Sequence, residues 1–211
     1  MANLGTPVTI EFKAFAEMGT MDESGRKNAS SDPRSLTKTA PGTKHILSWP
    51  STPKISQSIE VNYSTWELQH TNYQPVAFGN RATPTVTISG QWFSRNEEEA
   101  KRTLNAIHLI RAATSMFYGR DDKHKGTPPP IGRLNAHGLY NNTPVVVKTF
   151  NYDYPNDVDY IDVEMFNGIQ SVPVLFEMSV SLLVQMNSVD VVKSYTLDNF
   201  YNGKLLGDGY V

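Results

Sequence analysis

The feature that most constrains the fold is the regular alternation of apolar and polar residues along 172–186, "VPVLFEMSVSLLVQM". The apolar positions of one parity are Val174, Phe176, Met178, Val180, Leu182 and Val184. The other parity carries Glu177, Ser179, Ser181 and Gln185. Because successive side chains of a strand point to opposite faces, this pattern predicts a long, half-buried strand. Strands of this kind belong to antiparallel sheets with one solvated face.

Further segments carry the same signal. Residues 83–93, "TPTVTISGQWF", place Val86, Ile88 and Trp92 opposite threonine, serine and glutamine. Segments 6–15, 44–49 and 55–63 also predict strands, the last with Ile55, Ile59, Val61 and Tyr63 on one face. Residues 144–154 and 157–166 are separated by Pro155-Asn156, and this turn chemistry predicts that they form a hairpin. The chain is therefore expected to be rich in β-structure.

One helix is expected, over residues 94–118. Ser94 stands three residues before Glu97, the spacing of a capping box. Three glutamates, 97–99, occupy the first turn, where the helix dipole favours negative charge. An apolar stripe from Ala100 to Phe117 predicts one face packed on a sheet, and Gly119 is a plausible end. Strands surrounding a single helix predict a β-rich α+β fold.

The domain organisation follows from composition along the 211 residues. Residues 1–186 are expected to form one domain, which a chain of this length can fill with a sizeable core. Within it, residues 17–43 contain few large apolar side chains and predict a long polar loop. Residues 187–211 mix scattered apolar residues with glycine and aspartate. They predict a C-terminal arm that docks on another surface and is not part of the core.

The net charge and the amino-acid composition exclude several classes of function. The formal charge of −2 and the pI near 6.2 give no basic field for nucleic acid or acidic lipid. The absence of cysteine excludes disulfides, thiolate catalysis and cysteine-based zinc sites, and fits a reducing compartment. We expect neither a signal peptide at "MANLGTPVTIEFKAF" nor a membrane anchor, since no run of eighteen apolar residues occurs.

Catalytic motifs are poorly represented. None of the five histidines stands in H-E-x-x-H, and G-x-S-x-G, P-loop and Rossmann patterns do not occur. The acidic run from Asp153 to Glu164 lacks the opening and the glycine of a calcium loop. Asp157 and Asp159, expected on one strand face, could form an acid/base pair, although a solvated hairpin face explains them more simply. We therefore expect no enzyme activity, no cofactor and no metal.

Four segments between about residue 44 and residue 186 carry a resemblance to a known family. They are "TPTVTISGQWFSRNEEEAKRTLNAIHLIRAATSMFYG", "GTPPPIGRLNAHG", "YNNTPVVVKTFNYDYPNDVDYIDV" and "VPVLFEMSVSLLVQ". Each is weak alone, but their order and spacing are fairly specific. Together they resemble the tail tube initiator, or baseplate hub tube, proteins of contractile-tailed bacteriophages.

The resemblance implies two packed antiparallel sheets in a barrel-like tail tube fold, with one helix on the flank. It also implies a structural virion protein of the viral tail. Six copies would form a ring at the junction of baseplate and tail tube, initiate tube assembly and line the channel for genome ejection. The implied partners are tail tube, baseplate hub and spike proteins, with wedge or sheath proteins as further neighbours. DNA would pass without sequence recognition, and assembly would take place in the host cytoplasm.

On this reading the flanking helix and the connector 120–133 contact neighbouring subunits. "GTPPPIGRL" is a rigid return from the helix to the sheet, because prolines fix φ and lack amide donors. The interface candidates are Glu97, Glu98, Arg102, Arg111, Arg120, Asp121, Asp122, Lys123, Lys125 and Pro129. The candidates for an acidic channel lining are Asp157, Asp159, Asp162 and Glu164.

Three alternatives remain open from the sequence. The chain could be an ordinary tail tube subunit. It could be a soluble β-sandwich module that binds carbohydrate or peptide in an aromatic-lined groove formed by Trp49, Trp66, Tyr73 and Trp92. The third alternative is a hydrolase that uses Asp157 and Asp159.

Overall fold

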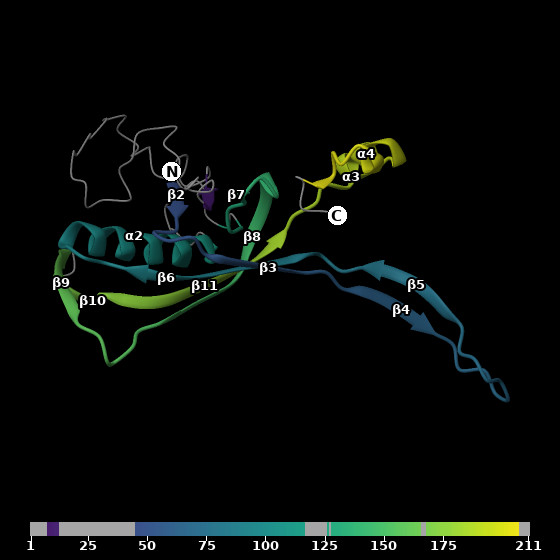
Figure 1. Cartoon of the computed structure of the whole chain (residues 1–211), viewed down its shortest axis with the longest axis horizontal. Helices are drawn as coiled ribbons and strands as arrows, with labels where there is room; N and C mark the ends of the chain where they lie inside the picture. Colours follow the sequence, from purple (N-terminus) through teal and green to yellow (C-terminus); the bar gives the residue numbers. More distant parts are fainter. Residues whose placement is uncertain (1–7, 13–44, 117–125, 127, 166–167, 207–211) are drawn as a thin grey trace, which may run out of the picture.

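The computed structural model describes residues 8–12, 45–116, 126, 128–165 and 168–206 (Figure 1). The first strands are β1 (Thr9–Phe12), β2 (His45–Ser48), β3 (Lys54–Ser58), β4 (Val61–Thr65), β5 (Val76–Arg81) and β6 (Thr85–Phe93). The later strands are β7 (Gly132–Ala136), β8 (Tyr140–Asp153), β9 (Tyr160–Met165), β10 (Gly168–Pro173) and β11 (Leu175–Val184). The helices of this part of the chain are α2 (Glu97–Ala113), α3 (Ser188–Ser194) and α4 (Leu197–Tyr201).

Seven strands form one antiparallel sheet in the order β2-β1-β7-β8-β11-β6-β3. β9 pairs with β10, and β4 with β5, in two smaller sheets. The β-rich α+β class is therefore confirmed, as are the strands expected within 6–15, 83–93 and 172–186, the first of them in its described part. The finer architecture differs, because the described strands of the core belong to one continuous sheet rather than to two separate packed sheets.

The core lies between the two halves of this curved sheet and helix α2. β8 is fourteen residues long and is shared by both halves (Figure 1), and its pairing with β11 is shifted at Ser181/Leu182. Such a bulge bends a strand and increases its twist. Residues of one half, such as Ile10 and Leu134, therefore join Ile88 and Val180 of the other half in one buried cluster. The predicted inward faces of β6 and β11 are the ones buried here.

Helix α2 confirms the expected flanking helix but begins later. Its N-cap is Asn96 rather than Ser94, and the Asn96 side chain accepts a hydrogen bond from the Glu99 amide at 2.9 Å. Ser94 is fully buried and its hydroxyl lies 3.1 Å from that of Thr103. Ser94 cannot serve as the N-cap because it still pairs as part of the strand: its backbone amide donates to the Val174 carbonyl at 2.8 Å. The N-cap is therefore the later residue Asn96. Phe117 and Gly119 lie outside the described residues.

The predicted hairpin between 144–154 and 157–166 is wrong. β8 pairs with β7 and β11, whereas β9 pairs with β10 through a register that matches Asp162 with Ser171. Local turn chemistry at Pro155-Asn156 reverses the chain without making the flanking strands neighbours. Asp157 and Asp159 consequently lie in the connection between β8 and β9, so they do not share a strand face.

Candidate assembly surfaces

A two-stranded ribbon extends beyond the end of the large sheet. We call it the hairpin arm and define it as residues 59–82, which include β4 and β5. The arm continues β3 and β6, and the Ala82 amide donates to the Glu60 carbonyl at 2.9 Å where it leaves the sheet. Figure 1 shows the arm projecting from the opposite end of the molecule to β9 and β10. The single strand expected over 55–63 is thus divided into β3 and β4, with residues 59 and 60 between them.

The hairpin arm has one apolar face and one polar face. Tyr63 is paired with Phe78, and alternation in this register brings Val61 and Val76 to the same face. The rings of Tyr63 and Phe78 make an edge-to-face contact with centroids 6.1 Å apart. On the other face the amide of Asn62 donates to the side-chain oxygen of Asn80 at 3.0 Å. The arm therefore has the amphipathic pattern of a strand pair that covers a core.

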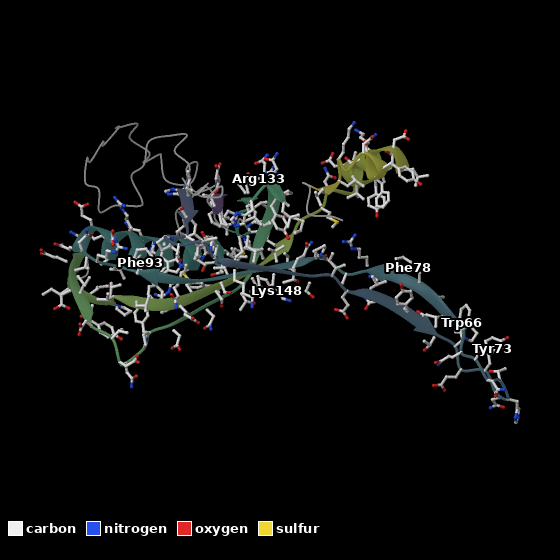
Figure 2. All side chains as sticks on the ribbon, in the orientation of Figure 1. Trp66, Tyr73, Phe78, Phe93, Arg133 and Lys148 are labelled. Carbon is white, nitrogen blue, oxygen red and sulfur yellow. The ribbon has the colours of Figure 1, made fainter. Side chains whose placement is uncertain are left out.

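No described residue covers this apolar face. The exposed fractions are 60% for Tyr63, 66% for Phe78 and 60% for Val76. The tip adds Trp66 and Tyr73, exposed by 60% and 70%, and Figure 2 shows both side chains at the far end of the arm beyond Phe78. A two-stranded hairpin is marginally stable in water, and a contiguous exposed apolar patch marks an interaction site. The arm is therefore a surface built for a partner.

A second uncovered surface follows β11. We call residues 188–206 the C-terminal unit, which consists of α3, α4 and the turn after them. Neither helix has a buried residue, and Leu205 is the one buried side chain of the unit. Its exposed apolar side chains are Val189, Val192, Tyr195, Leu197, Phe200, Tyr201 and Leu206. Helices of seven and five residues are too short to be stable alone, so this unit also requires a partner. The docking C-terminal arm expected over residues 187–211 stays a prediction, and residues 207–211 lie outside the description.

The face of the large sheet that points away from the core is lined by small polar side chains. One row across β8, β11 and β6 consists of Asn151, Ser179 and Ser89, and the next consists of Thr149, Ser181 and Thr87. The hydroxyls of Ser181 and Thr87 form a hydrogen bond with each other at 3.0 Å. These pairs leave a flat surface of hydroxyl and amide groups, which we call the polar sheet face.

The interface residues predicted on α2 and the connector are only partly described. Glu97, Glu98 and Arg102 are exposed on α2, and Glu97 forms an ion pair with Lys101 at 2.6 Å. The guanidinium of Arg111 lies over the Tyr152 ring, 5.4 Å from its centroid, and donates to the Tyr152 hydroxyl. Pro129 is exposed shortly before β7, which begins at Gly132. The remaining candidates lie outside the described residues: Arg120, Asp121, Asp122, Lys123 and Lys125.

The four acidic candidates for a channel lining lie together at the end of the molecule opposite the arm. Asp157 and Asp159 are exposed in the β8–β9 connection, and Asp162 and Glu164 are exposed on β9 (Figure 1). The hydroxyl of Ser171 donates to the Asp162 carboxylate at 2.5 Å. No group of three or more histidine, aspartate or glutamate side chains among the described residues is arranged to hold a metal ion.

Burial shifts the pKa of a few groups around the core. It raises the pKa of Tyr140 and Tyr154, and the neighbouring Tyr152 reinforces the shift of Tyr154 while Arg111 opposes it. Burial lowers the pKa of the His45 imidazole. Each shift favours the uncharged form, so these side chains remain neutral at neutral pH and contribute to packing. No helix in the described part of the chain is long and apolar enough to cross a bilayer.

The aromatic groove expected for a binding module does not form. Trp49 and Trp92 are buried in the core with ring centroids 6.3 Å apart, whereas Trp66 and Tyr73 are exposed on the arm. Sequence reasoning also missed the hairpin arm as a contact surface, although it predicted a docking C-terminal arm over residues 187–211. The signal for the arm was present in the alternation of 55–63, but an apolar stripe that faces a partner has the same pattern as one that faces a core.

Comparison with known proteins gives structural similarities but no match to a family model or a curated protein. The chain is similar to a protein in the solved structure of the tail of an empty GTA particle with C6 symmetry, at 10% sequence identity and a TM-score of 0.31. The match covers 64% of this chain and 81% of the other. Since a likeness of this extent does not establish a shared function, the assignment depends on the geometry of this chain and on its sequence resemblance.

Proposed function

We propose that this chain is a structural subunit of a phage tail-type assembly and has no enzymatic role. The observation that carries the proposal is the hairpin arm, whose apolar face contains Tyr63 and Phe78 and is covered by none of the described residues. A free-standing binding module or enzyme gains nothing from such an arm, because it invites aggregation unless a partner covers it. A subunit that is always part of a larger particle uses the arm to bind the neighbouring subunit.

The finer role proposed is a six-copy ring at the junction of baseplate and tail tube. The sequence resemblance to tube initiators supports this role, and the position of β2 and β3 as the two edge strands of the large sheet among the described strands suits it. Head-to-tail contacts between copies close a ring when the rotation between them fits. The proposed neighbours are tail tube and baseplate hub proteins, and an ordinary tube layer is the alternative position in the same particle.

The polar sheet face is the proposed lining of the central channel. Its central rows consist of serine, threonine and asparagine, and Lys54 on β3 extends the row of Ser89 as its one basic member. DNA adheres to proteins mainly through contacts between basic groups and phosphates, so the uncharged rows offer few contacts that would retain a passing duplex. The acidic group at Asp157, Asp159, Asp162 and Glu164 would add repulsion at one rim of the channel.

The test is assembly of a variant in which the arm becomes polar. From its 66% exposure, Phe78 has roughly 130 Å² available for burial in an interface, or about 3 kcal/mol at ~25 cal/mol/Å². This corresponds to more than about a hundredfold in affinity. We expect Tyr63→Ser with Phe78→Ser to abolish rings or mixed particles in mass photometry and electron microscopy. The thermal unfolding of the sheet should stay unchanged.

The matched control changes the opposite face of the same strands, Asn62→Ser with Asn80→Ser. It should assemble like the unmodified protein. A protein that stays monomeric at micromolar concentration together with its neighbours would contradict the proposal. An arm variant that assembles normally would show that the arm is not the joint.

A further inference from the structure

The hairpin arm and the C-terminal unit leave the large sheet at the same point. The amide of Val184, the last residue of β11, donates to the carbonyl of Pro84 at 3.1 Å. Pro84 directly precedes β6 and therefore stands at the root of the arm. The C-terminal unit begins four residues after Val184, and Figure 1 shows α3 and α4 beyond the same end of the sheet as the arm. Two surfaces that lack cover thus emerge side by side.

We propose that the C-terminal unit of one copy covers the hairpin arm of the next copy in the assembly. This rests on the proposed function, and it names the partner of the arm as a second copy of this chain. The contact joins two different surfaces, so it is head-to-tail and each copy takes part in two contacts.

The chemistry of the two surfaces is matched. The C-terminal unit carries two carboxylates, Asp190 and Asp198, against two ammonium groups, Lys193 and Lys204, so it has no net charge. Its exposed apolar side chains include Val192, Leu197, Phe200 and Tyr201. The apolar face of the arm presents Val61, Tyr63, Val76 and Phe78. Since the charges of the C-terminal unit cancel and the four residues of the arm's apolar face are uncharged, each apolar surface is best covered by another apolar surface.

The reach of each element favours contact between copies over contact within one chain. From Ser58, the last residue of β3, to Trp66 is eight residues, or about 26 Å at ~3.3 Å per residue. The tether from Val184 to Ser188, the first residue of α3, is four residues long and spans at most about 14 Å. The C-terminal unit is therefore held near the root of its own arm, whereas the exposed aromatics Trp66 and Tyr73 lie at the tip.

The available area is sufficient for a stable joint. The four aromatics of the arm, Tyr63, Trp66, Tyr73 and Phe78, are each exposed by 60–70%. At roughly 150–250 Å² per aromatic side chain they offer about 400–600 Å². Tyr195, Phe200 and Tyr201, exposed by 55–79%, add about 300–400 Å² on the same scale. With the aliphatic neighbours this reaches the ~1,000 Å² that a specific interface needs.

Cross-linking between two different variants tests the contact directly, because the chain contains no native cysteine. One sample carries Phe78→Cys on the apolar face of the arm, and the other carries Leu197→Cys on α4. The two proteins are mixed, assembled and treated with a short bismaleimide. We expect a cross-linked dimer of the two variants as the main product. The control pair, Asn80→Cys with Leu197→Cys, places the first thiol on the opposite face of the arm and should give little of this dimer.

Each outcome separates the inference from the proposed function. Particles that assemble from the two variants without the Phe78–Leu197 cross-link would overturn the inference and leave the proposed function intact. A failure of the unmodified protein to assemble would overturn the proposed function itself. A single chain carrying both substitutions and diluted until monomeric distinguishes the folded-back alternative: a cross-link formed there within one chain would also overturn the inference. If the first pair prevents assembly, Val76→Cys with Val192→Cys tests the same two surfaces at other exposed positions.

Discussion

Excision of the hairpin arm tests whether the arm serves assembly or folding. Residues 60–82 are replaced by Asn-Gly, which leaves Ile59, Thr83 and Pro84 to complete a five-residue loop between the paired Ser58 and Thr85. Loops of this length commonly join antiparallel strands. In the sequence, the buried core cluster contains Trp49 and then no further residue before Val86. Between these two, Ile55 on β3 is partly buried and packs against the cluster. The excision therefore removes no side chain from the core.

The magnitude follows from chain entropy and the weakness of an isolated hairpin. Shortening the connection from about 26 residues to five halves its length a little more than twice. The entropic cost of closing the loop therefore falls by at most about 1.5 kcal/mol, which stabilises the shorter chain. The lost contacts belong to a two-stranded ribbon that is marginal in water. The free energy of unfolding should thus stay within roughly 2 kcal/mol of the full-length value.

Urea unfolding followed by tryptophan fluorescence measures this value. Excision removes Trp66 and leaves Trp49 and Trp92, which are both buried and report on the core. Both proteins are compared at concentrations where mass photometry shows monomers, since assembly would stabilise the full-length chain by mass action. A loss of more than about 3 kcal/mol, the size of a large core truncation, would refute the reasoning. Retained assembly of the excised protein would refute the role of the arm.

Two further predictions concern the folded core. Gly132→Ala should lower the free energy of unfolding by about 1–3 kcal/mol in urea titrations, because an added Cβ would stand 2.9 Å from the side chains of both Ile10 and Phe12; an unchanged midpoint would contradict the close packing of β1 on β7. His45 has its pKa lowered by burial, so its contribution to stability is present above its ordinary value of 6.5 and is lost as the pH falls below it. His45→Gln should therefore lose less stability between pH 7.5 and 5.5 than the unmodified chain in thermal unfolding, and parallel pH curves would contradict this.

The strands and the helix were predictable because their signals are local. Alternation along 172–186 and 83–93 reflects burial of one strand face, and it found β11 and β6 with the correct inward side. The glutamates of the first turn of α2 located the helix. The N-cap residue was predicted wrongly, because the amide of Ser94 is hydrogen-bonded to the Val174 carbonyl and its hydroxyl to that of Thr103.

The predicted assembly sites stay predictions, unlike the strands and the helix. Charged residues of α2 such as Glu97 and Arg102 are exposed, but Arg111 is engaged with Tyr152 within the fold. The uncovered apolar surfaces lie elsewhere, on the arm and in the C-terminal unit. Charge alone does not identify such a surface, because a solvated helix face carries the same residues as a contact face.

The sequence by itself determined that β1, β6 and β11 are strands, which sides of β6 and β11 are apolar, and that one helix flanks the sheet. The tertiary structure decided which strands pair, as β8 with β11 rather than with β9. It also decided where the core ends: Ile55 packs on the core, whereas Tyr63, which continues the same alternation, is exposed on the arm. The physical reason is that alternation is a property of neighbouring residues, while cover depends on segments far away in the chain or on another molecule.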